Sequence, residues 1–436
     1  MKKKVSIKMD EKSVFFSGKF ASQYMIIPGY GKIDIVKMSA QNGIRMLNSA
    51  SGCKKEFIRG IYDLVCHKQF TVKFKNKESG IVFLIDDSIC DRKSIVQTIY
   101  ATAQTAEDAC IMQIKQNYIH NRTIKEKLSR LKKAFVLAWQ IIRLFGTLTD
   151  KLVFLYTALL CSELFGVLDK KMKNSPNLMV MFCETNFVPS IVVQYCRLCE
   201  IKTATLQEGV FMEYRGGTND IYRGIDLKCI LSDYFLTWSC YTYDVAVKGG
   251  VNKERIHIVG NPRCLLAGNK TQKKNGAYEI FGVALGAGFV LNRENIQLIK
   301  MANKLARHLN MRYVIRFHPG EMGVQEQYTN EYYTKNTQIS SMSVDDYVNM
   351  TDFTIMVSGG LYPELVYRRH RTYKLNIYSV SDQYRDIQWN SFANYKELET
   401  LVNNDAELTP EQIEYIVGPD NLEERYRKFF EKFRYH

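Results

Sequence analysis

Short apolar runs alternate with helical patterns along most of this chain, and this alternation limits how the chain can fold. Between residues 178 and 377 the runs are continuous and rich in β-branched and aromatic side chains, and segments with apolar residues at helical spacing separate them. Continuous apolar strands are typical of parallel sheets that helices cover on both faces. The pattern therefore predicts an α/β fold built on parallel sheets.

The expected elements follow from the same pattern. We expect strands at residues 22–27, 71–74, 81–85, 178–182, 201–206, 227–231, 256–259, 281–285, 313–315, 353–357 and 373–377. We expect helices at residues 94–118, 121–143, 185–199, 238–248, 295–309, 344–350, 362–369, 395–403 and 410–433.

A polar, basic segment divides the chain. Residues 268–276 hold no large apolar side chain and have the composition of a linker. We therefore expect an N-terminal domain over 1–267, a C-terminal domain over 277–415, and a final helix over 416–436 that crosses back. The length of 436 residues and the apolar share of 46% suit two such domains. A cleft between them is the natural place for a ligand.

Arg316-Phe317-His318-Pro319 follows an expected strand, so His318 lies where a strand ends and a loop begins. Ligands bind at the carboxyl ends of strands in open α/β sheets. Pro319 restricts the backbone and keeps the preceding residue extended. A histidine held in this way can reach a phosphate oxygen. The alternative is a His-Pro turn without chemistry.

Three further strand ends carry candidate residues. Gly286-Ala287-Gly288 would let backbone N–H groups approach a phosphate. Ser358-Gly359-Gly360 would form an anion site at a helix start, and Glu364 one turn later would meet a ribose or base. Glu208 is the candidate general base, because it comes directly after a buried strand. Each has a plain alternative: a tight turn, a helix cap, or a solvated carboxylate.

Residues 121–143 predict a basic amphipathic helix. It is either an ordinary solvated face or a contact with an anionic membrane surface. The net charge of +15 also favours an anionic partner, but no nucleic-acid-binding signature accompanies it. No signal peptide or transmembrane pattern is visible, and eleven scattered cysteines suit reduced thiols. We expect a cytoplasmic protein, peripheral at the inner face of the cell membrane.

The order of these motifs resembles the GT-B glycosyltransferases of bacterial surface-polysaccharide synthesis. The similarity covers residues 177–377: Gln-Glu-Gly after a strand, Ile-Val-Gly-Asn-Pro-Arg before the linker, a glycine loop, Arg-Phe-His-Pro, and Val-Ser-Gly-Gly followed by a glutamate. The set is similar to bacterial sialyltransferases and Kdo transferases. Gln207 departs from their pattern, because an acid is usual there.

The resemblance implies two Rossmann-like domains facing across a cleft, and a metal-independent transfer from a CMP-linked sugar to a surface glycan or a lipid-linked glycan. It implies Glu208 as the base, with His318, Ser358 and Gly359 at the donor phosphate. The CDP-glycerol and polyol-phosphate transferases share the fold and a similar His-Pro, so they remain an alternative. A nucleotide-binding homologue without activity is another.

Overall fold

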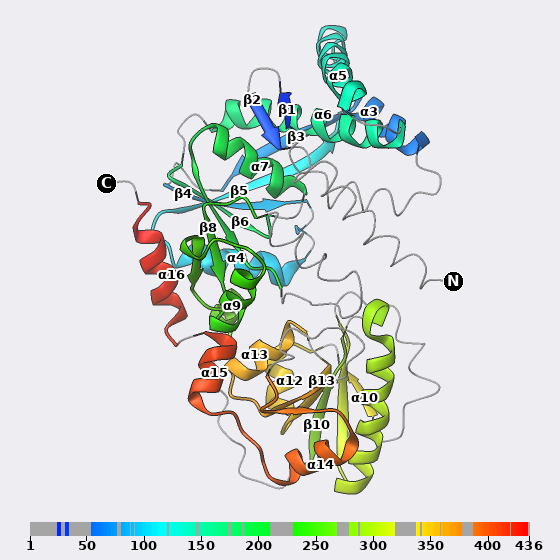
Figure 1. Ribbon diagram of the computed structural model, residues 1–436, viewed down its shortest axis with the longest axis vertical. Coiled ribbons are helices and arrows are strands. Elements are labelled where there is room, and N and C mark those ends of the chain that lie inside the picture. Colours follow the sequence, from blue (N-terminus) through cyan, green and yellow to red (C-terminus); the bar gives the residue numbers. More distant parts are fainter. Residues whose placement is uncertain are drawn as a thin grey trace.

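The computed structural model describes residues 24–27, 31–34, 54–75, 80–87, 89–90, 92–119, 122–144, 148–172, 176–184, 187–209, 230–267, 279–286, 288–318, 337–340, 342–357, 359–376, 387–418 and 420–434. They form two α/β domains, one above the other in Figure 1. This confirms the predicted fold class. The expected linker at 268–276 lies outside the described residues, and the domain boundaries stay a prediction.

The N-terminal domain is built on a seven-stranded sheet in the order β3-β5-β4-β6-β7-β8-β9. All neighbouring pairs are parallel except β3 and β5, which run antiparallel. The strands are β3 (Lys68–Phe74), β4 (Ile81–Asp86), β5 (Ala109–Tyr118), β6 (Leu178–Phe182), β7 (Lys202–Leu206), β8 (Tyr234–Thr237) and β9 (Ile256–Ile258). A separate antiparallel pair joins β1 (Tyr24–Ile27) to β2 (Gly31–Asp34).

Helices cover both faces of this sheet. The described helical segments are α3 (Lys54–Cys66), α4 (Lys93–Gln104), α5 (Ile124–Leu144), α6 (Leu148–Lys171), α7 (Phe187–Leu198), α9 (Cys240–Lys248) and the 3₁₀ turns η1 (Lys253–Arg255) and η2 (Pro262–Leu266). Successive strand residues face opposite ways, so Leu84 packs under α6 and α7 while Phe83 packs under α4. This arrangement explains why the central strands are apolar throughout.

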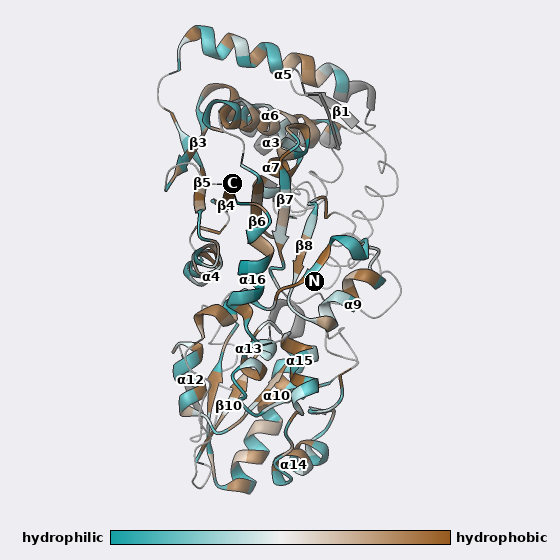
Figure 2. Ribbon diagram, turned by 90° about the vertical axis from the view of Figure 1, so that its left-hand side faces the viewer, coloured by the Kyte–Doolittle hydropathy of each residue, from teal (hydrophilic) through white to brown (hydrophobic). Residues whose placement is uncertain are grey.

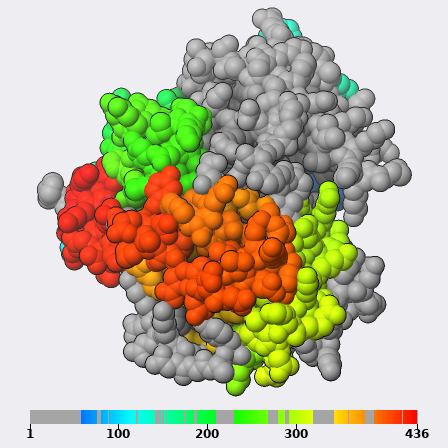
Figure 3. All heavy atoms as spheres, turned by 60° about the horizontal axis from the view of Figure 1, so that its bottom comes forward, coloured from blue at the N-terminus to red at the C-terminus, as the bar shows by residue number. Residues whose placement is uncertain are grey.

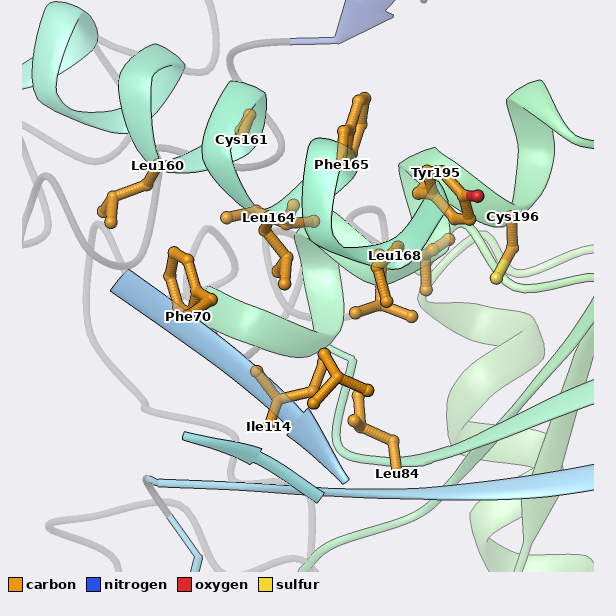
Figure 4. Close-up of a cluster of buried hydrophobic side chains, with 14 of the residues drawn as sticks. Phe70, Leu84, Ile114, Leu160, Cys161, Leu164, Phe165, Leu168, Tyr195 and Cys196 are labelled. Carbon is orange, nitrogen blue, oxygen red and sulfur yellow. The ribbon is translucent and has the colours of Figure 1, made fainter. Parts of the chain in front are cut away.

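Helix α6 is the centre of one core. It is apolar on all sides, and Leu160, Leu164 and Leu168 are fully buried. A helix of this kind must be covered all round. The sheet covers one side of it, through Phe70, Leu84 and Ile114 in Figure 4. Helices α3, α5 and α7 cover the others.

The C-terminal domain has a six-stranded, all-parallel sheet in the order β12-β11-β10-β13-β14-β15. Its strands are β10 (Ile280–Ala284), β11 (Arg312–Arg316), β12 (Thr337–Ser340), β13 (Thr354–Val357), β14 (Thr372–Leu375) and β15 (Ser391–Phe392). Its described helices are α10 (Gly288–Leu309), α12 (Val344–Met350), α13 (Leu361–Tyr367), α14 (Tyr395–Asn403) and α15 (Pro410–Val417). Helices α10 and α14 share one core with the sheet.

The two domains share a core. Tyr241 and Val245 of α9 pack in one buried cluster with Leu365 of α13 and Ile416 of α15. The orange and red C-terminal segments lie against the green N-terminal segment in Figure 3. The last helix, α16 (Leu422–Glu431), packs on the N-terminal sheet, where Phe430 meets the ring of Phe83 at 5.4 Å between centroids. The chain end therefore returns to the first domain.

Two predicted helices are wrong. The helix expected over 94–118 ends at Gln104, and β5 follows, paired with β3 and β4. Of the strand expected at 227–231, residues 227–229 lie outside the described residues and 230–231 are not in a strand; the described strand nearby is β8, at Tyr234–Thr237. The helix expected over 410–433 is two helices, because Gly418 has a φ of 85°. A Cβ at Gly418 would collide with the carbonyl oxygen of Trp238.

Candidate functional site

Three candidate loops share one edge of the C-terminal sheet. Strand β10 is parallel to β11 on one side and to β13 on the other, so the three strands end together. After β10 the chain adds β11 and β12 on one side, and then crosses to β13 on the other. Such a reversal of strand order is a topological switch point, where open α/β sheets bind ligands. Gly286, His318 and Gly359 follow these three strands.

The loop after β10 is held by a side chain that the sequence did not single out. The Asn295 amide of α10 accepts a hydrogen bond from Gly286 N at 2.9 Å and donates one to Gly286 O at 3.0 Å. Asn295 is fully buried, so both bonds are shielded from water. Ala287 lies outside the described residues, and Gly288 is the first residue of α10. The loop thus leads directly into the positive end of a long helix.

The residues at the end of β11 differ in their exposure to solvent and in their contacts. Phe317 is buried, while His318 is exposed at the edge of the sheet. The Arg316 guanidinium donates to the Met342 carbonyl and lies 5.8 Å from the Tyr347 ring centroid. Burial lowers the pKa of Arg316. These contacts hold Arg316 in the domain, whereas His318 is accessible to a ligand. Pro319 lies outside the described residues.

The end of β13 connects the site to the other domain. Ser358 lies outside the described residues; Gly359 and Gly360 precede the short helix α13. Glu364 of α13 is largely buried, and its Oε1 lies 3.2 Å from Arg263 Nη1 of η2. The carboxylate that was expected to meet a ribose therefore has a partner in the N-terminal domain. Arg263 belongs to the Asn-Pro-Arg segment, which gave no sign of this contact.

Glu208 lies just past β7 and is half-buried. Its Oε1 is 3.4 Å from Arg92 Nη1, which is mostly exposed. Gln207 before it is buried and anchors the segment: its Oε1 accepts from Trp238 N at 3.0 Å, and its Nε2 donates to Gly209 O at 2.8 Å. Gln207, at the position where the resemblance led us to expect an acid, fixes the backbone at the strand end. Glu208 remains accessible to a substrate.

The N-terminal sheet has its own switch point between β4 and β6. Asp86, at the end of β4, is 1% exposed, and Glu184, just past β6, is 3% exposed. Glu184 accepts backbone N–H bonds from Leu231 and, at 2.9 Å, from Ser232. Burial raises the pKa of Glu184. We had not expected Glu184 here, because the sequence around it shows a strand end only.

The described part of the chain contains no group of three or more His, Cys, Asp or Glu side chains arranged to hold a metal ion. Cys196 is buried and Cys199 exposed, and both are free thiols. Within the same residues, every helix is too short or too polar to cross a membrane.

One pocket of about 580 Å³ lies between β9 and α16, away from the switch points. Side chains of both charges line it.

Comparison with known proteins supports the architecture. No family model and no curated protein matches the sequence. Among solved structures, Staphylococcus aureus MnaA in complex with UDP is similar over 81% of this chain and 97% of its own, with a TM-score of 0.52 and 11% identity. UDP-GlcNAc 2-epimerase from Methanocaldococcus jannaschii (81% of this chain, 99% of its own, TM-score 0.49, 13% identity) and TarM (64% and 58%, 0.43, 14%) are also matched.

The two-domain architecture of this chain is the GT-B fold, as the motif order predicted. At this level of identity the likeness concerns the fold. The switch-point edge of the C-terminal sheet combines a clamped glycine loop that opens a long helix, an exposed imidazole, and a second glycine loop.

Proposed function

We propose that this chain is a glycosyltransferase that moves a sugar from a nucleotide-activated donor to a hydroxyl group of a surface glycan. The observation that carries the proposal is the common edge at which β10, β11 and β13 end. Glycine loops at such an edge let backbone N–H groups meet a phosphate, and an adjacent imidazole adds a proton donor. A nucleoside monophosphate or diphosphate is the ligand that these groups fit.

In the proposed reaction, Glu208 takes the proton of the acceptor hydroxyl as its oxygen attacks the anomeric carbon of the donor sugar. The bond from that carbon to the phosphate oxygen breaks, and its electron pair stays on the phosphate. His318 and the loops at Gly286–Gly288 and Ser358–Gly360 stabilise this developing negative charge. We propose that Arg316, Pro319 and Glu364 also belong to the donor site. We propose that the transfer needs no metal ion, so EDTA should not reduce it.

The finer identity of the donor is part of the proposal. The motif order supports CMP-linked sialic acid or Kdo. CDP-glycerol and other CDP-polyols are the alternative, and the UDP bound in the related MnaA structure adds uridine nucleotides. A nucleotide-binding homologue without turnover is the non-enzymatic alternative. We propose a glycan or lipid-linked glycan of capsule or lipopolysaccharide as acceptor, and a cytoplasmic location at the inner face of the cell membrane.

A donor panel tests this proposal. The purified chain is incubated with CMP-, CDP- and UDP-linked donors and a mixture of glycan acceptors, and released nucleotide is measured. We expect release with one donor class, and a loss of at least about 100-fold in kcat for Glu208→Gln and for His318→Ala, since each removes a proton-transfer or charge-stabilising group. Unchanged turnover in either variant would remove that residue from the mechanism. Tight binding without turnover would favour the non-enzymatic alternative.

A further inference from the structure

Helix α5 exposes a continuous apolar stripe. Along its 21 residues, five large apolar side chains recur at spacings of four, three, four and four, which places them on one face. Each is more than half exposed: Ile124 77%, Leu128 61%, Leu131 58%, Phe135 72% and Trp139 55%. Single exposed apolar residues are common, but an aligned stripe of this kind marks an interaction surface. Figures 1 and 2 show α5 at the far end of the molecule from the C-terminal domain.

The opposite face of α5 is fixed to the domain. Arg130 Nη1 donates to Leu64 O at 2.9 Å and to Lys68 O at 3.1 Å, and its Nη2 pairs with Glu163 of α6. Ala134 and Leu137 are buried in the core of the N-terminal domain. Burial lowers the pKa of Arg130, while Glu163 opposes that shift. The stripe therefore points outward because the other side of the helix is anchored.

This geometry changes which residues of α5 can meet a partner. The sequence favoured the basic side chains as the contact, but Arg130 lies on the inner face, and Arg122, just before the helix, donates to the Lys68 carbonyl. Lys125 and Lys132 are exposed, and at 100° per residue they lie beside the stripe. The outer surface is thus an apolar band with a lysine flank, and Trp139 lies towards one end of it.

We propose that the outer face of α5 docks in the plane of an anionic lipid bilayer. An apolar stripe bordered by lysines is the pattern by which amphipathic helices lie at the interface, with the apolar face among the acyl chains and the lysines at the headgroups. Tryptophan favours the same boundary. The net charge of +15 complements an anionic surface and opposes pairing with a second copy of this chain. The anchored helix would hold the domain at a fixed orientation to the bilayer.

Vesicle co-sedimentation of the full chain tests this. We use phosphatidylcholine vesicles with and without about one third phosphatidylglycerol, at two salt concentrations. We expect binding to the anionic vesicles that weakens with salt. The variant Leu128→Gln/Leu131→Gln/Phe135→Gln should bind at least about 10-fold more weakly, since three large side chains no longer enter the bilayer. Lys125→Gln/Lys132→Gln should bind more weakly by a smaller factor, and its binding should depend less steeply on salt.

The controls keep the outcome clear. Val247→Gln/Leu266→Gln removes two exposed apolar residues elsewhere and should bind like the parent chain. In a Trp389→Phe background, Trp139 emission should shift to the blue on binding, because Trp238 is already buried. Circular dichroism and melting check that each variant is folded. The proposal is overturned if the parent chain ignores anionic vesicles, if the triple variant binds equally, or if the stripe instead holds together a dimer that the triple variant dissociates. None of these readouts depends on sugar transfer.

Discussion

Arg263 of the N-terminal domain and Glu364 of the C-terminal domain form an ion pair at 3.2 Å. The Glu364 side chain is 10% exposed and that of Arg263 30%, so the pair is largely withdrawn from water. It lies between η2 and the helix that follows the switch-point strand β13. The pair therefore fixes the candidate donor site against the other domain.

Removing one partner of this pair should destabilise the protein. Arg263→Ala leaves the carboxylate of Glu364 nearly buried and uncompensated, and we expect a loss of about 1–3 kcal/mol in urea unfolding. The double variant Arg263→Ala/Glu364→Gln should recover part of this loss, because the buried charge is gone. The matched control is Arg92→Ala, which breaks an exposed pair and should cost less than about 0.5 kcal/mol. Equal losses for Arg263→Ala and Arg92→Ala would contradict this interpretation.

Asn295 should control the shape of the first glycine loop. In Asn295→Ala both hydrogen bonds to Gly286 are lost in a buried place, and we expect a loss of about 2 kcal/mol together with nucleotide binding about 10-fold weaker. The control is Asn303→Ala on the same helix, which breaks a 2.7 Å bond to Tyr313 and should weaken stability only. Calorimetric titration and thermal melting separate the two effects. If both variants bind nucleotide alike, the clamp has no part in the site.

Stability should depend on pH through His370. This ring is buried, bonds to Thr354 Oγ1 at 2.9 Å, and burial lowers its pKa to about 3. The unfolded chain takes up a proton near pH 6.5, but the folded chain does not. His370 therefore contributes fully above pH 6.5, and that contribution is lost as the pH falls from 6.5 towards 3.

Comparing unfolding free energies at pH 4.5 and 7 checks this. His370→Gln should be less sensitive to acid than the parent chain, by up to about 1.4 kcal/mol per pH unit in this window. Other groups such as Glu184 also titrate, so the difference between chains is the relevant quantity. An identical pH dependence in His370→Gln and the parent would show that the pKa of His370 is not lowered by folding.

Much of the architecture was predictable because local pattern and tertiary structure agree. The central strands are buried on both faces, so their sequences carry an unbroken apolar signal, and α12 and α14 begin and end as the spacing predicted. The strand β5 was missed because its outer half, Lys115 to Tyr118, is polar. Its identity as a strand comes from pairing with β3 and β4, which no local window shows.

The candidate site was predictable only as a set of strand ends. The positions of Gly286, His318 and Gly359 follow from where strands stop, and strand order then brings them to one edge. Contacts between distant residues could not be foreseen. Asn295 looks like any polar residue of a helix, and the Arg263–Glu364 pair spans 101 residues of sequence. The outward stripe on α5 was also hidden, because the pattern shows an apolar face without showing which face meets the core.

Calorimetric titration of nucleotides into three chains tests the central claim most directly. CMP, CDP, UDP and GDP are titrated into the parent chain, into His318→Ala, and into His308→Ala, whose ring lies about 30 Å along α10 from its first residue. We predict that the parent chain and His308→Ala bind at least one of these nucleotides equally, and that His318→Ala binds it at least about 10-fold more weakly. Equal binding by all three chains, or binding by none, would contradict a nucleotide site at the edge where β10, β11 and β13 end.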